Sequence, residues 1–150
     1  MTINEANAFA GKKEGRKLIL LMPGSRLMEI EKMLPTLLEA AKIIQKQLPE
    51  VDFVMPRAGT IPLNLLEEKI QASGLDVSIT EGHNYDLFSV ADLALATSGT
   101  VTLEAALCGL GSVIVYRTNP LTYMIAKMVV NIPHIGLPNI VAGRSVVPEL

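Results

Sequence analysis

The amino-acid sequence predicts an α/β fold: a Rossmann-like, three-layer domain with a mainly parallel sheet. Short, continuous apolar runs alternate with amphipathic segments of helical period along most of the chain. Such runs are typical of parallel strands, because helices cover both faces of a parallel sheet. Strands that alternate with helices in this way form βαβ units with right-handed crossovers.

The composition fits one globular domain. The chain has 150 residues, of which 49% are hydrophobic and 19% charged, and these values exclude a disordered chain. Thirteen basic and fifteen acidic side chains give a net charge of -2, so we expect no nucleic-acid partner.

Cys108, the single cysteine, falls in an apolar helical stretch and is predicted to be buried. With neither a signal peptide nor a spanning segment in sight, we expect a cytoplasmic protein.

The sequence of the first third of the chain predicts a flexible N-terminal segment, a strand and a helix. Residues 1–16 are small, polar or charged without a clear period, which predicts a flexible N-terminal segment before a domain over 17–150. The apolar run Lys17–Met22 predicts a buried strand. From Ile30 to Leu48 an apolar stripe predicts a helix, which Pro35 either kinks or divides in two.

The rest of the chain repeats the alternation of strand and helix. Turn residues and apolar periodicity predict strands at 52–55, 77–80, 93–96 and 112–116, and helices at 62–73, 85–90, 100–108 and 119–131. A loop-rich tail is expected after the last helix. Gly74 and Gly109 mark two of the helix ends.

The first candidate site is the turn after the first strand. Gly24 permits a tight or left-handed turn, and Ser25 is expected to cap the following helix. Arg26 is unusual there, because a cation at a helix N-terminus opposes the helix dipole unless an anion binds beside it. Position alone leaves an anion site and a solvent-facing arginine equally open.

The second candidate site is the turn Thr97–Thr100. Ser98, Gly99 and Thr100 open a helix whose free N–H groups favour phosphate oxygens. Glu104 is the only charged residue between Asp92 and Arg117. It lies too far along for a capping box, whereas a carboxylate about one turn into the helix could accept hydrogen bonds from ribose hydroxyls. We favour that role over a structural ion pair.

Other polar residues give weaker signals. Arg57 follows a predicted strand and leaves function and structure equally open, while His83 and His134 are interpreted as solvated or structural. The seven methionines are interpreted as core residues. No Asp-x-Asp pair is present to hold a cation against a diphosphate, so neither a metal nor a cofactor is expected.

Three motifs together resemble lipid-A-disaccharide synthase. They are Pro23-Gly24-Ser25-Arg26 with Glu29-Ile30, Ser98-Gly99-Thr100-Val101-Thr102-Leu103-Glu104, and Leu137-Pro138-Asn139-Ile140. The similarity extends over 17–150, and the combination is far more specific than any one motif. Two departures are Gly109-Leu110-Gly111-Ser112, where the family usually has a proline, and Tyr116-Arg117 in place of Tyr-Lys.

The resemblance implies the second, nucleotide-binding domain of a two-domain GT-B glycosyltransferase. Its donor is UDP-2,3-diacylglucosamine, its acceptor is lipid X, and its product is lipid A disaccharide phosphate. The implied donor-site residues are Gly24, Ser25 and Arg26, Ser98, Gly99 and Thr100, Glu104, and Asn139. Arg26 and the second turn would bind diphosphate, and Glu104 the ribose. The acceptor domain, with its catalytic aspartate, and further C-terminal helices are missing from the chain, so we expect binding without turnover.

Two rival functions remain. Another UDP-N-acetylglucosamine enzyme, the peptidoglycan transferase or the 2-epimerase, shares a similar turn and a ribose glutamate. A non-catalytic nucleotide-binding module is the other rival. The apolar segment 119–130, with Lys127 as its one charge, further predicts self-association or adhesion to the inner membrane surface, with a helix buried against the sheet equally open.

Overall fold

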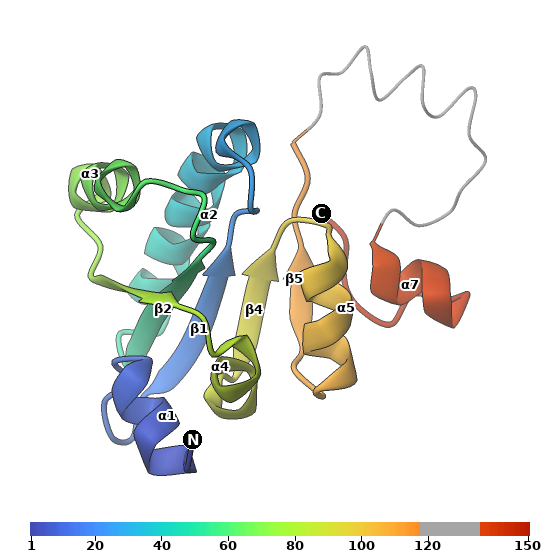
Figure 1. Cartoon of the computed structure of the whole chain (residues 1–150), viewed down its shortest axis with the longest axis horizontal. Helices are drawn as coiled ribbons and strands as arrows, with labels where there is room; N and C mark the ends of the chain where they lie inside the picture. The colour runs from blue at the N-terminus through green and yellow to red at the C-terminus, as the bar shows by residue number, and fades with distance from the viewer. Residues whose placement is uncertain (118–135) are drawn as a thin grey trace.

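The computed structural model describes residues 1–117 and 136–150, which form a three-layer α/β domain (Figure 1). Its centre is a five-stranded, all-parallel sheet in the order β3-β2-β1-β4-β5. The strands are β1 (Lys17–Met22), β2 (Val51–Arg57), β3 (Val77–Glu81), β4 (Leu93–Ala96) and β5 (Ser112–Ile114). The helices are α1 (Ile3–Phe9), α2 (Leu27–Gln47), α3 (Leu63–Ser73), α4 (Asn84–Val90), α5 (Thr100–Leu107) and α7 (Leu137–Ala142). The predicted fold class is confirmed.

Helices cover both faces of the sheet, as the uninterrupted apolar strands require. Alternate residues of β1 point to opposite faces, so Leu18 and Leu20 enter one apolar core while Ile19 and Leu21 enter the other. The first core packs against α1, α4 and α5, and the second against α2 and α3. In Figure 1, α4 and α5 accordingly lie in front of the sheet and α2 behind it.

Helix α2 runs unbroken through Pro35, which decides between the two possibilities that the sequence left open. Pro35 lies on the exposed side of the helix, so its ring stays out of the core. The predicted stripe is buried at Ile30, Leu34 and Leu37, but Leu48 is exposed. The boundaries of α3 match the prediction closely, because Pro62 precedes it and Gly74 ends it in the left-handed conformation.

The N-terminal segment differs from the predicted flexible tail. Helix α1 begins with a capping box in which Thr2 and Glu5 satisfy each other's backbone N–H groups. It packs against α4 and buries Ala6 and Ala10 completely. Two alanines and the partly buried Phe9 carry this packing, so the stretch has too few large apolar residues to mark an amphipathic helix in a sequence.

The C-terminal part holds two further differences. Helix α7 replaces part of the predicted loop-rich tail, and residues 148–150 lie parallel to β5, with a bridge between Ile114 and Glu149. Cys108 is exposed at the end of α5, so its predicted burial was wrong: the helix ends there and turns the side chain outward. The predicted strand 112–116 is two residues shorter than expected.

The predicted helix at 119–131, with Lys127, and also His134, lie outside the described residues. Within the residues that the structure describes, none of the helices combines the length and apolar character needed to span a bilayer. The predictions of self-association and membrane adhesion made from that segment therefore stay predictions.

Candidate functional site

The two candidate turns lie side by side at the carboxyl edge of the sheet. Strands β1 and β4 are neighbours with Met22 paired to Ala96, and the chain leaves β1 towards α2 on one face and β4 towards α5 on the other. The Thr97 N–H joins the turns directly by donating to the Met22 carbonyl at 3.0 Å. Ligands of open α/β sheets bind at this kind of topological switch point, in the crevice between diverging helices.

The first turn is occupied by the chain's own carboxylate. Glu29 accepts hydrogen bonds from the N–H groups of Ser25 at 3.0 Å and Arg26 at 3.2 Å. Arg26 is the N-cap residue of α2, so the expectation that Ser25 caps this helix with its hydroxyl was wrong. Glu29 therefore supplies the negative charge that the helix N-terminus favours.

Arg26 carries a long side chain that has one weak partner, Glu29, among the described residues. The Arg26 side chain is 83% exposed, and its guanidinium lies 3.5 Å from the Glu29 carboxylate. An exposed ion pair of this length holds the side chain loosely, so Arg26 is able to move towards an incoming anion. Gly24 has φ of 119°, and a Cβ there would lie 2.5 Å from the Glu29 carboxylate, so this position requires glycine.

The second turn is open. Gly99 is the N-cap residue of α5, with extended backbone at φ of 174°, and a Cβ built on it meets no atom of the described residues within 4 Å. The Thr102 hydroxyl donates to the Gly99 carbonyl at 2.7 Å and fixes the first turn of the helix. The N–H groups that begin a helix have no partners within it, so this N-terminus offers donors to an anion from a surface with free space.

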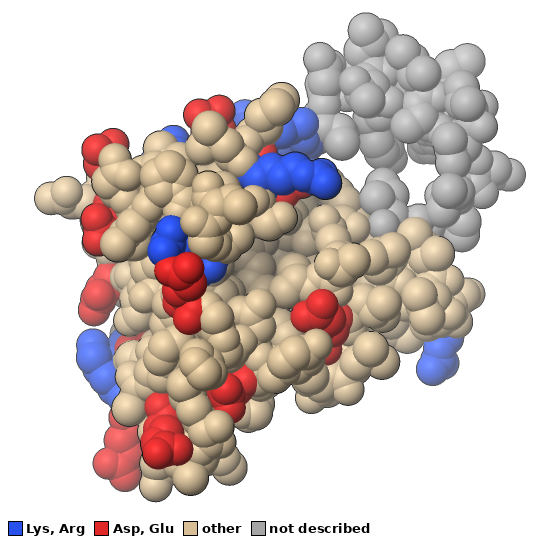
Figure 2. All heavy atoms as spheres, viewed as in Figure 1, with Lys and Arg blue, Asp and Glu red and all other residues tan. Residues whose placement is uncertain are grey.

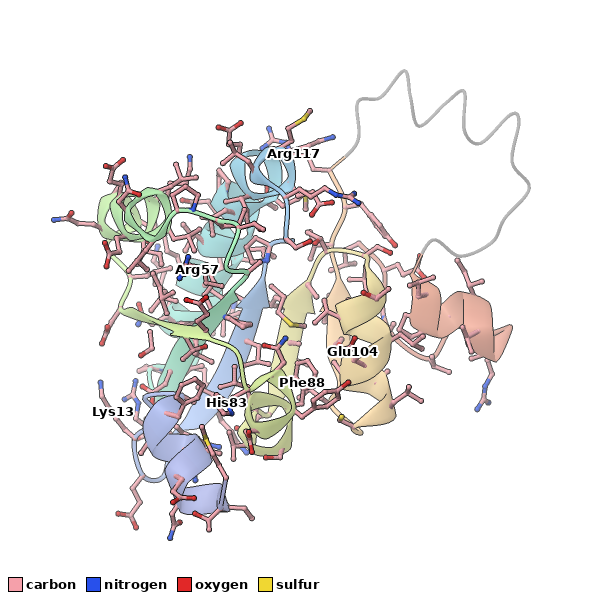
Figure 3. All side chains as sticks on the ribbon, in the orientation of Figure 1. Lys13, Arg57, His83, Phe88, Glu104 and Arg117 are labelled. Atoms are coloured by element: carbon pink, nitrogen blue, oxygen red, sulfur yellow. The ribbon has the colours of Figure 1, made fainter. Side chains whose placement is uncertain are left out.

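Glu104 lies on α5 and is half-buried (Figure 3). Within residues 1–117 and 136–150, its carboxylate takes part in neither a hydrogen bond nor an ion pair. In the space-filling view the acidic side chain over α5 lies across a hollow from basic side chains near the N-terminal end of α2 (Figure 2). The structural ion pair that would have explained Glu104 is thus not formed by these residues.

Tyr116 contacts the second turn. Burial raises the pKa of the Tyr116 phenol above its ordinary value, the nearby Ser98 acts to lower it, and the charge of Glu149 acts to raise it again. Tyr116 and Glu149 both belong to the edge of the sheet beyond β4, and sequence reasoning assigned neither to the site. Arg117, which is exposed, follows β5 at the same carboxyl edge of the sheet (Figure 3).

Asn139 is not placed to bind a ligand in this structure. Its side chain is fully buried and makes four hydrogen bonds within the chain. An amide has two donor hydrogens and two acceptor lone pairs, so its capacity is filled. The motif alone suggested this residue, and motifs do not distinguish a ligand from a buried support.

Arg57 and His83, whose roles the sequence left open, both contact neighbouring parts of the fold. Arg57 donates to the Ile61 carbonyl at 2.6 Å and pairs with Glu81, which fixes the loop between β2 and α3. His83 precedes α4 in the left-handed conformation and stacks edge-on against Phe9, with ring centroids 5.4 Å apart.

Comparison with known sequences gives one family. The family model described as lipid-A-disaccharide synthetase matches residues 2–150. The lipid-A-disaccharide synthase of Geobacter sulfurreducens is 44% identical over 98% of this chain and 38% of its own length. That of Trichlorobacter lovleyi is 41% identical over 100% of this chain and 39% of its own length. The chain thus spans about two fifths of the curated relatives it matches, and the similarity includes the segment before Lys17.

Solved structures share the fold at low sequence identity. The glycosyltransferase WaaG, described as involved in lipopolysaccharide biosynthesis, has a TM-score of 0.58 and 22% identity over 81% of this chain and 34% of its own. A UDP-GlcNAc 2-epimerase from Neisseria meningitidis, solved with UDP-GlcNAc, has a TM-score of 0.56 and 20% identity over 94% of this chain and 37% of its own. Fold likeness at this identity leaves several families open, whereas the sequence match does not: the chain belongs to the lipid-A-disaccharide synthetase family.

Proposed function

We propose that this chain is the donor-binding half of a GT-B lipid-A-disaccharide synthase and binds the UDP part of UDP-2,3-diacylglucosamine. The observation that carries the proposal is the meeting of two strand-to-helix turns at the β1–β4 switch point, with Glu104 one turn into α5. Family membership supplies the substrate class, and the switch point supplies a place for the nucleotide.

The diphosphate is assigned to the second turn. Glu29 already accepts the Ser25 and Arg26 N–H groups, so a phosphate at the first turn would have to displace a carboxylate. The N-terminus of α5 has open space at Gly99 and the same preference for negative charge. Arg26 then reaches across from the first turn and pairs with the diphosphate from the other side.

The ribose is assigned to Glu104. A carboxylate one helical turn beyond the phosphate site can accept hydrogen bonds from two neighbouring hydroxyls. Half-buried and without an ion pair among the described residues, it has the acceptor capacity that this role needs. Asn139 is assigned a supporting role, because its hydrogen-bonding capacity is filled.

In the complete enzyme this half would stabilise the leaving UDP while the sugar is transferred to lipid X with inversion. Negative charge develops on the diphosphate as the glycosidic bond breaks, and Arg26 together with the α5 N-terminus would stabilise that charge. The acceptor site and the catalytic base are assigned to the part of the family protein that this chain does not cover. Because donor and acceptor carry acyl chains, the enzyme is expected at the surface of the inner membrane.

Calorimetric titration with UDP tests the proposal. We expect saturable binding of UDP by the purified chain, tighter binding of UDP-2,3-diacylglucosamine, and weaker binding of CMP. Addition of lipid X to these 150 residues and donor should give no disaccharide, because they match only about two fifths of the curated relatives and the acceptor site is assigned to the remainder. Equal affinity for UDP and CMP, or synthesis of disaccharide by the chain alone, would contradict the assignment.

A further inference from the structure

A buried hydrogen-bond cluster joins α7 to the C-terminal segment. Asn139 donates from Nδ2 to the Val147 carbonyl at 2.9 Å and to Glu149 at 2.5 Å. Its Oδ1 accepts from the N–H groups of Val146 at 2.7 Å and Val147 at 2.9 Å. A fully buried amide with all four bonds made holds its partners in one arrangement, because loss of any bond leaves a buried polar group unsatisfied.

The cluster fixes residues 148–150 against the sheet. Besides Asn139, Glu149 accepts the Gly136 N–H at 3.1 Å, so its side chain bridges the start of α7 and the segment beside β5. The backbone of this segment pairs with β5 through three bonds of 2.8 Å: Ile114 N–H to Pro148, Leu150 N–H to Ile114, and Tyr116 N–H to Leu150. Asn139 and Glu149 therefore hold the segment that flanks β5 on the side away from β4.

The end of β5 in turn contacts the second turn. The Val115 N–H donates to the Ala96 carbonyl at 2.8 Å, two residues before Ser98. Next in sequence, Tyr116 buries its hydroxyl, which makes no hydrogen bond with the described residues, and Ser98 and Glu149 lie near enough to act on that phenol. Hydrogen bonds thus lead from Asn139 and Glu149 through residues 148–150 to the end of β5 and to Ala96, and the Tyr116 phenol lies near both Glu149 and Ser98.

We propose that Asn139, Glu149 and Tyr116 are positioning residues that hold the Ser98-Gly99-Thr100 turn in the geometry that binds diphosphate. They act through the segment 148–150 and the end of β5, without touching the nucleotide. The inference rests on the proposed function for the ligand, but its structural part concerns the turn alone. It also explains why the Leu137-Pro138-Asn139 motif accompanies the donor site although Asn139 has no free hydrogen-bonding capacity.

Two mild substitutions test the inference in the whole chain. Glu149→Gln keeps an oxygen acceptor for Gly136 and Asn139 but removes the charge beside Tyr116, and Tyr116→Phe removes only the hydroxyl. Glu39→Gln is the matched control, since Glu39 is 69% exposed on α2 and pairs only with Lys42 among the described residues. UDP affinity is measured by calorimetry, and the amide resonances of Ser98, Gly99 and Arg26 by ¹H–¹⁵N NMR of the ligand-free chain.

We expect each of the two substitutions to weaken UDP binding about 3- to 30-fold, the range typical of residues that act through a network. The double variant should bind UDP only slightly more weakly than the weaker-binding single variant, because both substitutions act through Tyr116. In the ligand-free chain, the Ser98 and Gly99 amides should shift while that of Arg26 stays, and Glu39→Gln should change nothing.

Wild-type affinity in both variants, or unmoved Ser98 and Gly99 amides, would overturn the inference. A wild-type chain that binds no UDP would overturn the proposed function instead. In that event the amide shifts, which need no ligand, still decide whether Glu149 and Tyr116 position the turn.

Discussion

Gly24→Ala tests the structural account of the first turn. The backbone at Gly24 has φ of 119°, a conformation that residues with a Cβ rarely adopt. The new methyl group would lie 2.5 Å from Oε2 and 2.8 Å from Cβ of Glu29. Both the backbone and the Glu29 side chain must therefore move, and the carboxylate loses its bonds to the Ser25 and Arg26 N–H groups.

The expected destabilisation combines two effects. Backbone strain of this kind costs about 1–3 kcal/mol. Loss of a carboxylate at a helix N-terminus costs about 0.5–2 kcal/mol. We therefore expect the free energy of unfolding to fall by about 2–4 kcal/mol, which moves the urea midpoint down by roughly 1–2 M at an unchanged slope.

Gly99→Ala is the matched control. Its backbone is extended and a methyl group there meets no atom of residues 1–117 or 136–150 within 4 Å, so the free energy of unfolding should change by less than about 1 kcal/mol. The same methyl group stands at the proposed diphosphate site, and UDP affinity should fall at least about tenfold, the loss expected when a phosphate loses one good hydrogen bond. Equal stability of the two variants in urea would refute the account of Gly24.

Three further substitutions distinguish residues that bind UDP from residues that stabilise the fold. Glu104→Gln should weaken UDP binding by about 1–3 kcal/mol in calorimetry and leave the unfolding temperature unchanged, and the reverse pattern would favour a structural Glu104. Burial acts to raise the pKa of Asp92, but the Leu18 N–H and two lysines bond its carboxylate and together lower the pKa below the ordinary value. The stability that Asp92 contributes is thus complete above about pH 4 and lost as the pH falls further, so urea midpoints measured below pH 4 should fall less steeply for Asp92→Asn than for wild type. Arg57→Met removes the bond to the Ile61 carbonyl and should lower the free energy of unfolding by about 1–3 kcal/mol with UDP affinity intact, whereas a selective loss of UDP binding would place Arg57 in the site.

The sequence predicts the sheet well because its signals there are local. The apolar run of β1 and the Pro62 and Gly74 signals of α3 each lie within the element they define. The alternation of strands and helices then constrains the order in the sheet to few choices. Both candidate turns were located from their own residues, whereas the meeting of β1 and β4 that brings the turns together is seen only in the structure.

The parts that sequence reasoning missed depend on partners distant in the chain or on small side chains. Helix α1 buries alanines, which carry no amphipathic signal, and Cys108 is exposed because its helix ends sooner than the apolar pattern does. Arg26 at a helix N-terminus suggested that an anion lies nearby. Glu29 accompanies the first motif, but nothing in the sequence indicated that its carboxylate is that anion. The burial of Asn139 depends on residues 146–149 folding back over it, which no spacing predicts.

The position of β1 at the centre of the sheet also bears on how the chain folds. Strands β1, β2 and β3 follow one another, as do β4 and β5, so each group is closed by short connections. The crevice requires β1 to meet β4, a contact such as that of Leu18 with Asp92, which are 74 residues apart. Pairings of this sequence separation raise the contact order and slow folding. The two turns come together only when β1 pairs with β4, the longest-range pairing of the sheet. Nucleotide binding during refolding would therefore appear only after the whole sheet has formed, and not when β1–β3 or β4–β5 has formed alone.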